Sequence, residues 1–196
     1  MAYVPVRRIV TGHDANGKAI ILEDSAAPRV TEMGGEDGPV FHEIWTTGTM
    51  PAIIDRASGE PHEDRLSLLP PTNGTRIRVI DAPPESESDE QLTADQAQMM
   101  FEMINAPNVK THYAGSDAPH PLMHRTETLD YAIILEGEMT LILDDSETVV
   151  RAGDIVIQRG TNHGWANRGK QKCRAIFVMI DGKFDEVLAQ EALSPS

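Results

Sequence analysis

Two stretches decide the fold: H-R-T-E-T-L-D-Y at residues 124–131 and G-D-I-V-I-Q-R-G-T-N-H-G-W-A-N at residues 153–167. Each stretch carries one histidine, and an apolar strand–turn–strand unit lies between them. His124 and His163 are 39 positions apart, yet antiparallel strand pairing can place them side by side in the mouth of a small barrel. We expect the rest of the chain to support that barrel.

From residue 112 onward, short apolar runs alternate with turns that are rich in Gly and Asp. Many short strands separated by such turns are typical of a β-sandwich or a barrel of the jelly-roll kind. The predicted fold class is therefore all-β. Strands are expected at residues 131–135, 139–143, 148–150, 155–157 and 174–180.

The N-terminal half adds further strands. An Asn-Gly pair at residues 16–17 favours a tight hairpin, and residues 40–45 are rich in branched and aromatic side chains. Residues 76–80, R-I-R-V-I, alternate polar and apolar side chains, which predicts a half-buried strand. Residues 48–73 are loop-rich, and the sequence leaves open whether they form a lid, a dimer arm or plain surface.

One helix is expected over about residues 93–105, with Thr93 as its cap. Its apolar residues are expected to pack in the core: Met99, Met100, Phe101, Met103 and Ile104. We expect a single domain over residues 1–196. Its parts are N-terminal strands and an arm (1–92), the helix, a motif-bearing barrel (108–181) and a partly helical tail (182–196).

The net charge of −14 argues against nucleic acid as a partner, since phosphate contacts need clustered Lys and Arg. It also disfavours anionic membrane surfaces. No run approaches the ~18–20 apolar residues of a membrane span, and residues 1–10 show no secretory signal. The single Cys173 cannot form an internal disulfide. These features predict a cytoplasmic protein in which Cys173 is a packed apolar residue.

The first stretch resembles the first motif of the cupin superfamily, G-x5-H-x-H-x3,4-E-x6-G. It matches at His124, Thr126, Asp130 and Gly137. Thr126 stands where the family has its second His, and Asp130 stands where it has Glu. The same residues are similar to single-barrel cupins with an H-R-T-x-T-x-D-Y signature.

The second stretch resembles the second cupin motif, G-x5-P-x-G-x2-H-x3-N. It matches at Gly153, Gly160, His163 and Asn167. Gln158 replaces the proline, and the first spacer is one residue shorter. Together the two motifs imply a cupin jelly-roll β-barrel with added N-terminal strands and one or two short helices.

The resemblance also implies a metal centre, because cupins use three His and one Glu to hold Fe, Mn, Ni or Zn. Here His124 and His163 are retained, and Asp130 is a third ligand if its shorter side chain can reach. Two His and one carboxylate would make a facial triad. The alternative is an empty barrel in which the two histidines contact substrate or are simply hydrogen-bonded.

Three further residues are expected to contact substrate. Alternation along the strands places Thr126 on the face of His124, and Trp165 on the face of His163. Trp165 would then form an aromatic wall. His120 lies in a Pro-flanked loop from which it could reach the barrel mouth, although a solvent-facing position is the simpler expectation.

Two functions follow from the resemblance. The first is a metal-dependent enzyme acting on a small organic acid or an aromatic or polyketide-like compound, by dioxygenation, decarboxylation, isomerisation or dehydration. The second is a non-catalytic or metal-free cupin that binds a small molecule. Either would form a homodimer, since cupins of this kind usually dimerise through N-terminal strands.

Overall fold

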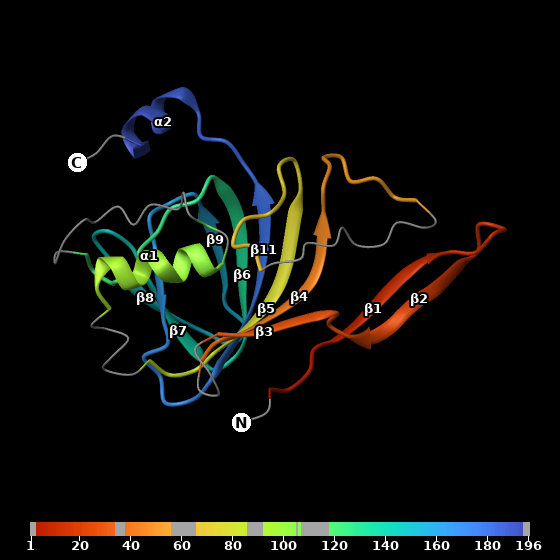
Figure 1. The fold of residues 1–196 in the computed structure, drawn as a ribbon, viewed down its shortest axis with the longest axis horizontal. Helices are drawn as coiled ribbons and strands as arrows, with labels where there is room; N and C mark the ends of the chain where they lie inside the picture. Colours follow the sequence, from red (N-terminus) through yellow and green to blue (C-terminus); the bar gives the residue numbers. More distant parts are fainter. Residues whose placement is uncertain are drawn as a thin grey trace.

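The computed structural model describes residues 3–33, 38–55, 66–85, 92–104, 106 and 118–193. Two helices, α1 (Ala94–Met103) and α2 (Glu186–Leu193), accompany a fold built mainly of strands (Figure 1). The strands are β1 (Arg7–His13), β2 (Ala19–Ala26), β3 (Arg29–Glu32), β4 (Val40–Thr47), β5 (Thr75–Ala82), β6 (Thr128–Glu136), β7 (Glu138–Ile142), β8 (Glu147–Arg151), β9 (Ile155–Arg159), β10 (Gly164–Ala166) and β11 (Cys173–Asp181). The all-β prediction is confirmed.

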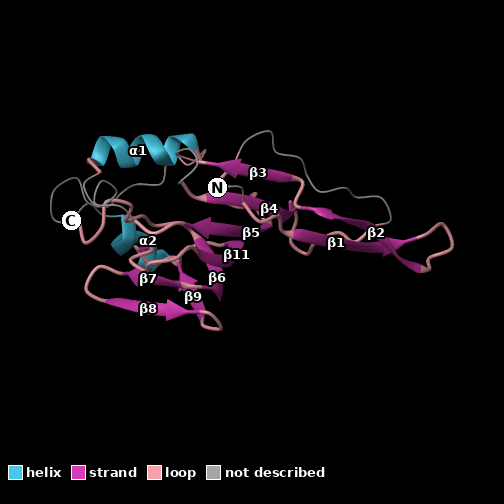
Figure 2. Cartoon of the chain, turned by 90° about the horizontal axis from the view of Figure 1, so that it is seen from below, coloured by secondary structure: helices cyan, strands magenta, loops and turns pink. Residues whose placement is uncertain are grey.

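Within the described residues, all strand pairs are antiparallel and fall into three sheets. The largest has the order β3-β4-β5-β11-β6-β9, and a smaller one has the order β10-β7-β8. In Figure 2, α1 and the strands β7 and β8 lie at opposite edges of the stacked strands. The motif-bearing strands of the C-terminal half therefore lie in both layers, with the interior between them.

The third sheet is the hairpin β1–β2, which projects away from the other strands in both Figure 1 and Figure 2. Its turn is held by Asp14, whose carboxylate accepts hydrogen bonds from the N–H groups of Asn16 (2.8 Å) and Lys18 (2.9 Å). Gly17 takes the positive φ of 80° that the turn requires. The predicted N-terminal hairpin is confirmed.

Helix α1 begins with a capping box. The hydroxyl of Thr93 accepts from the Gln96 N–H (3.2 Å), and the Gln96 side chain accepts from the Thr93 N–H (2.8 Å). Phe101 and Ile104 are buried, as expected. The expectation was wrong for Met99 and Met103, which are 62% and 68% exposed, because a surface helix buries only one stripe of its circumference.

Strand β5 is buried on both faces, which corrects the half-buried prediction. Arg76 and Arg78 point to the interior side and are 2% and 1% exposed, while Val79 on the other face is 4% exposed. Glu43 on β4 makes this possible, since its carboxylate pairs with Arg76 at 2.9 Å and with Arg78 at 3.1 Å. Paired charges can be buried where isolated ones cannot.

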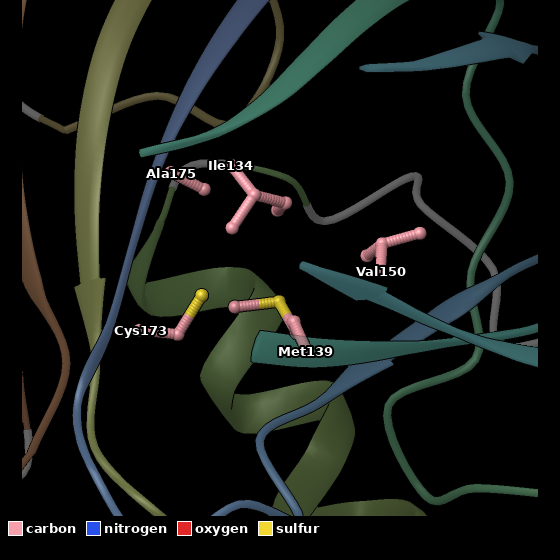
Figure 3. Close-up of a cluster of buried hydrophobic side chains, with 5 residues drawn as sticks. All are labelled: Ile134, Met139, Val150, Cys173 and Ala175. Carbon is pink, nitrogen blue, oxygen red and sulfur yellow. The ribbon is translucent and has the colours of Figure 1, made fainter. Parts of the chain in front are cut away.

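Part of the core is a cluster of buried hydrophobic side chains (Figure 3). Its buried members are Ile134, Met139, Val150, Cys173 and Ala175. Cys173 is fully buried, with its sulfur near the Met139 side chain (Figure 3). Cys173 is therefore a packed apolar residue, as predicted. None of the helices in the described residues is long and apolar enough to span a membrane.

Candidate functional site

A cavity of about 320 Å³ lies inside the barrel, with α1 forming part of its wall. Its apolar lining comes from both sheets and the helix: Phe41, Ile80, Met100, Phe101, Ile104, Ala132, Met139, Trp165, Phe177 and Met179. Its polar lining comes mainly from the two motifs and β5: Arg78, Glu85, His124, Thr126, Asp130, Gln158, His163 and Asn167. A mostly apolar cavity with a few polar groups is the usual form of a small-molecule site.

His124 and His163 lie side by side in this cavity. They form an isolated antiparallel bridge in which the N–H of each residue donates to the carbonyl of the other, at 2.8 and 2.9 Å. Their ring centroids are 4.3 Å apart. The pairing that the sequence predicted is confirmed.

Main-chain carbonyls fix the tautomer of both rings. The Nδ1–H of His124 donates to the carbonyl of Leu122, and the Nδ1–H of His163 donates to that of Thr161, each at 2.9 Å. A carbonyl can only accept, so the proton of each neutral ring is on Nδ1 and the lone pair is on Nε2. Neither Nε2 is hydrogen-bonded within the described part of the chain. Both Nε2 atoms can therefore accept a proton or bind a metal ion.

Burial keeps both rings neutral. It lowers the pKa of His124, and it lowers the pKa of His163 to about 3, with the neighbouring His124 adding to the effect. The backbone hydrogen bonds oppose these shifts without reversing them. At neutral pH the pair thus offers two uncharged imidazoles, the form that binds a transition metal.

Asp130 extends into the cavity from β6. It is 6% exposed, and its Oδ1 has no hydrogen-bond partner among the described residues. Burial raises its pKa to about 6, opposed by a hydrogen bond from Thr128 and by the charge of Arg78. A carboxyl group in this state can hold or release a proton near neutral pH.

Thr126 and Trp165 both line the cavity, as alternation predicted. The Thr126 hydroxyl is 2.7 Å from that of Thr128. Trp165 stands edge-on to Phe177, with ring centroids 5.6 Å apart. The two rings form an aromatic wall beyond the histidine pair.

His120 is not solvent-facing, which corrects that expectation, and it does not line the cavity. It is 3% exposed, and its Nε2 is 3.0 Å from Oε1 of Glu85. Glu85 does line the cavity. Sequence reasoning missed Glu85 and Arg78, because Glu85 lies outside both motifs and Arg78 was assigned to the polar face of a half-buried strand.

Comparison with known proteins agrees with this arrangement. The family model "Cupin domain" matches residues 110–179. Phomopsin biosynthesis cluster protein C' of Diaporthe leptostromiformis is 30% identical over 189 residues, which cover 92% of this chain and 80% of that protein. The chain belongs to the cupin superfamily.

Other similar proteins are named as cupins. The cupin-domain-containing oxidoreductase virC of Hypocrea virens is 28% identical to this cupin, over 90% of this chain and 76% of that one. Among solved structures, an RmlC-like cupin from Shewanella frigidimarina is similar at 12% identity with a TM-score of 0.40, covering 79% of this chain and 85% of that one.

Two of the residues expected to hold a metal, His124 and His163, lie together in the structure. The histidine pair has the right tautomers and charge for two ligands. Within the described residues, however, no group of three or more His, Cys, Asp or Glu is placed to hold one ion, so Asp130 does not complete a triad with the pair.

Proposed function

We propose that this cupin is an oxidoreductase-type enzyme that acts on a small organic acid or an aromatic or polyketide-like compound inside the barrel. The observation that carries the proposal is the pair of neutral imidazoles that line the cavity, with Nδ1 of each ring bonded to a main-chain carbonyl and the lone pair therefore on Nε2. Relatives named as cupin-domain-containing oxidoreductases support the reaction class.

The cavity wall supports the substrate class. Trp165 and Phe177 offer ring edges and faces to a flat ligand, and Met139 and Met179 are polarisable side chains that adapt to its shape. Arg78, inside the barrel, would attract an acidic or enolic oxygen. Thr126 is placed to contact the same ligand.

We assign His124 and His163 as protein ligands of a divalent transition metal (Fe, Mn, Ni or Zn). When bound, the metal would act as a Lewis acid on a substrate oxygen. The chain itself supplies the orientation, since the Leu122 and Thr161 carbonyls hold the rings. For Asp130 we propose a proton-holding role on the cavity wall in place of the third-ligand role expected from the sequence.

A second function is favoured by one specific observation. Thr126, which replaces the second cupin histidine, is hydrogen-bonded to Thr128, and a hydroxyl so engaged is a poor metal ligand. In this alternative the protein is a metal-free cupin that binds a small molecule through the same cavity. Both functions are compatible with the predicted homodimer.

Elemental analysis decides between them. The purified protein is measured before and after reconstitution with Fe, Mn, Ni or Zn, beside His124→Ala, His163→Ala and the exposed control His13→Ala. Near-stoichiometric metal in the parent and the control, and at least tenfold less in both site variants, supports the metal-dependent enzyme. Equal metal in all four proteins contradicts the assignment, and none in any of them favours the binding protein.

A further inference from the structure

Glu85 is the acidic group of the cavity that the proposed function leaves unused. It follows β5, and its N–H donates to the carbonyl of Asn167 (2.8 Å). The Asn167 side chain in turn donates to the carbonyl of Ala82 (2.8 Å). Glu85 is thereby tied at its main chain to the end of the β10 strand, with its side chain on the cavity wall.

His120 holds one oxygen of this carboxylate. The N–H of Leu122 donates to Nδ1 of His120 (3.2 Å), so the proton of the neutral ring is on Nε2, the opposite tautomer to that of the reactive pair. That Nε2–H donates to Oε1 of Glu85 at 3.0 Å. The other oxygen, Oε2, is buried and has no hydrogen-bond partner among the described residues. Leaving a buried acceptor unpaired is costly, so Oε2 is suited to a ligand.

Asp130 presents the same feature elsewhere on the cavity wall. Asp130 pairs with Met179 on β11, whereas Ala82, just before Glu85, pairs with Cys173. These two positions on β11 are six residues apart, so the two carboxyl groups are held at different places along the cavity wall. Oδ1 of Asp130 is buried and unpaired as well. The rings of Trp165 and Phe177 line the same cavity.

We propose that Glu85, positioned by His120, binds one hydroxyl group of an aromatic ligand whose other hydroxyl lies near Asp130. This deepens the proposed function, on which it rests, by naming the ligand class: aromatic compounds with two hydrogen-bond donors. Ethers and hydrocarbons of the same shape would leave both buried acceptors unpaired and bind more weakly.

The test uses rigid probes of increasing length: hydroquinone, 2,6-dihydroxynaphthalene and 4,4'-dihydroxybiphenyl, each beside its dimethyl ether. Affinities are measured by calorimetry or tryptophan fluorescence on the parent, Glu85→Gln, His120→Ala and the exposed control Glu147→Gln. We expect the parent and the control to prefer at least one diol over its ether. Glu85→Gln should weaken that diol about 10- to 100-fold and leave its ether unchanged or tighter, because the new amide is a donor. His120→Ala should lower the same preference.

Two outcomes overturn the inference. One is that no diol binds the parent more tightly than its ether. The other is that Glu85→Gln changes diol and ether affinities by the same factor. That result is expected if Glu85 only stabilises the end of β10. His163→Ala separates this result from failure of the proposed function, because metal content in that variant is read without any diol. If the parent binds metal and His163→Ala loses it, but no diol is preferred over its ether, only the proposed role of Glu85 is contradicted.

Discussion

The main chains of His124 and His163 exchange two hydrogen bonds, and the rings above them are 4.3 Å apart. This pairing joins the two motifs at one point of the barrel. It also lets His124 help to lower the pKa of His163, because two imidazolium ions at this separation would repel in a poorly solvated cavity.

In the metal-free protein, the imidazole of His163 should remain neutral in mildly acidic solution. With its pKa lowered to about 3, His163 should show the Nδ1–H tautomer and no titration between pH 8 and 5. Long-range ¹H–¹⁵N NMR spectra of the metal-free protein test both points. The urea-unfolded chain is the control, in which histidines titrate near 6.5. Titration of His163 above pH 5, or an Nε2–H tautomer, would show that the carbonyl of Thr161 does not fix the ring.

Asp130→Asn should change the pH dependence of stability in the metal-free protein. The folded pKa of about 6 lies above the ordinary 3.8, so the folded state holds its proton more tightly than the unfolded state. The contribution of Asp130 to the free energy of unfolding therefore falls as pH rises from about 4 to 6, by roughly 3 kcal/mol at most. Urea unfolding at pH 4 and pH 7.5 should show Asp130→Asn gaining stability relative to the parent at the higher pH. A difference that is the same at both pH values contradicts the raised pKa.

Cys173 should be inert in the folded protein. Burial raises the pKa of its thiol to about 11, and the charges of Asp81 and Glu138 add to this effect. A thiol-specific disulfide reagent at pH 8 should therefore label the native chain negligibly and label one thiol per chain in guanidinium. Cys173→Ser should lose about 1–3 kcal/mol, because the hydroxyl would have no partner beside Ile134 and Met139. Rapid labelling under native conditions would contradict this packing.

The predicted homodimer should depend on the projecting hairpin β1–β2. Ile9, Ile21 and Leu22 are 50%, 63% and 50% exposed on it, and light scattering after gel filtration should give a mass of about two chains. Ile21→Glu should shift that mass toward one chain, whereas Lys18→Glu at the turn should not. A parent protein of one chain at all concentrations, or a dimer that tolerates Ile21→Glu, removes the hairpin from the interface.

The sequence was sufficient for most of the strands, the helix cap and the meeting of His124 with His163, since these follow from local patterns and from strand pairing. It also placed Trp165 inside the barrel. It did not predict the short strands β3 and β10. It failed for Arg78, because alternation shows that two faces differ but not which one turns inward. That choice was made by Glu43, a partner 35 positions away. The same limit hid the pairing of His120 with Glu85, which joins two loops.

The carbonyls of Leu122 and Thr161 belong to the main chain, so the hydrogen bonds that orient both imidazoles do not involve any neighbouring side chain. The lining of the cavity can therefore be exchanged residue by residue while the reactive pair keeps its direction. For protein engineering, this separates the part of the barrel that chooses a compound from the part that acts on it.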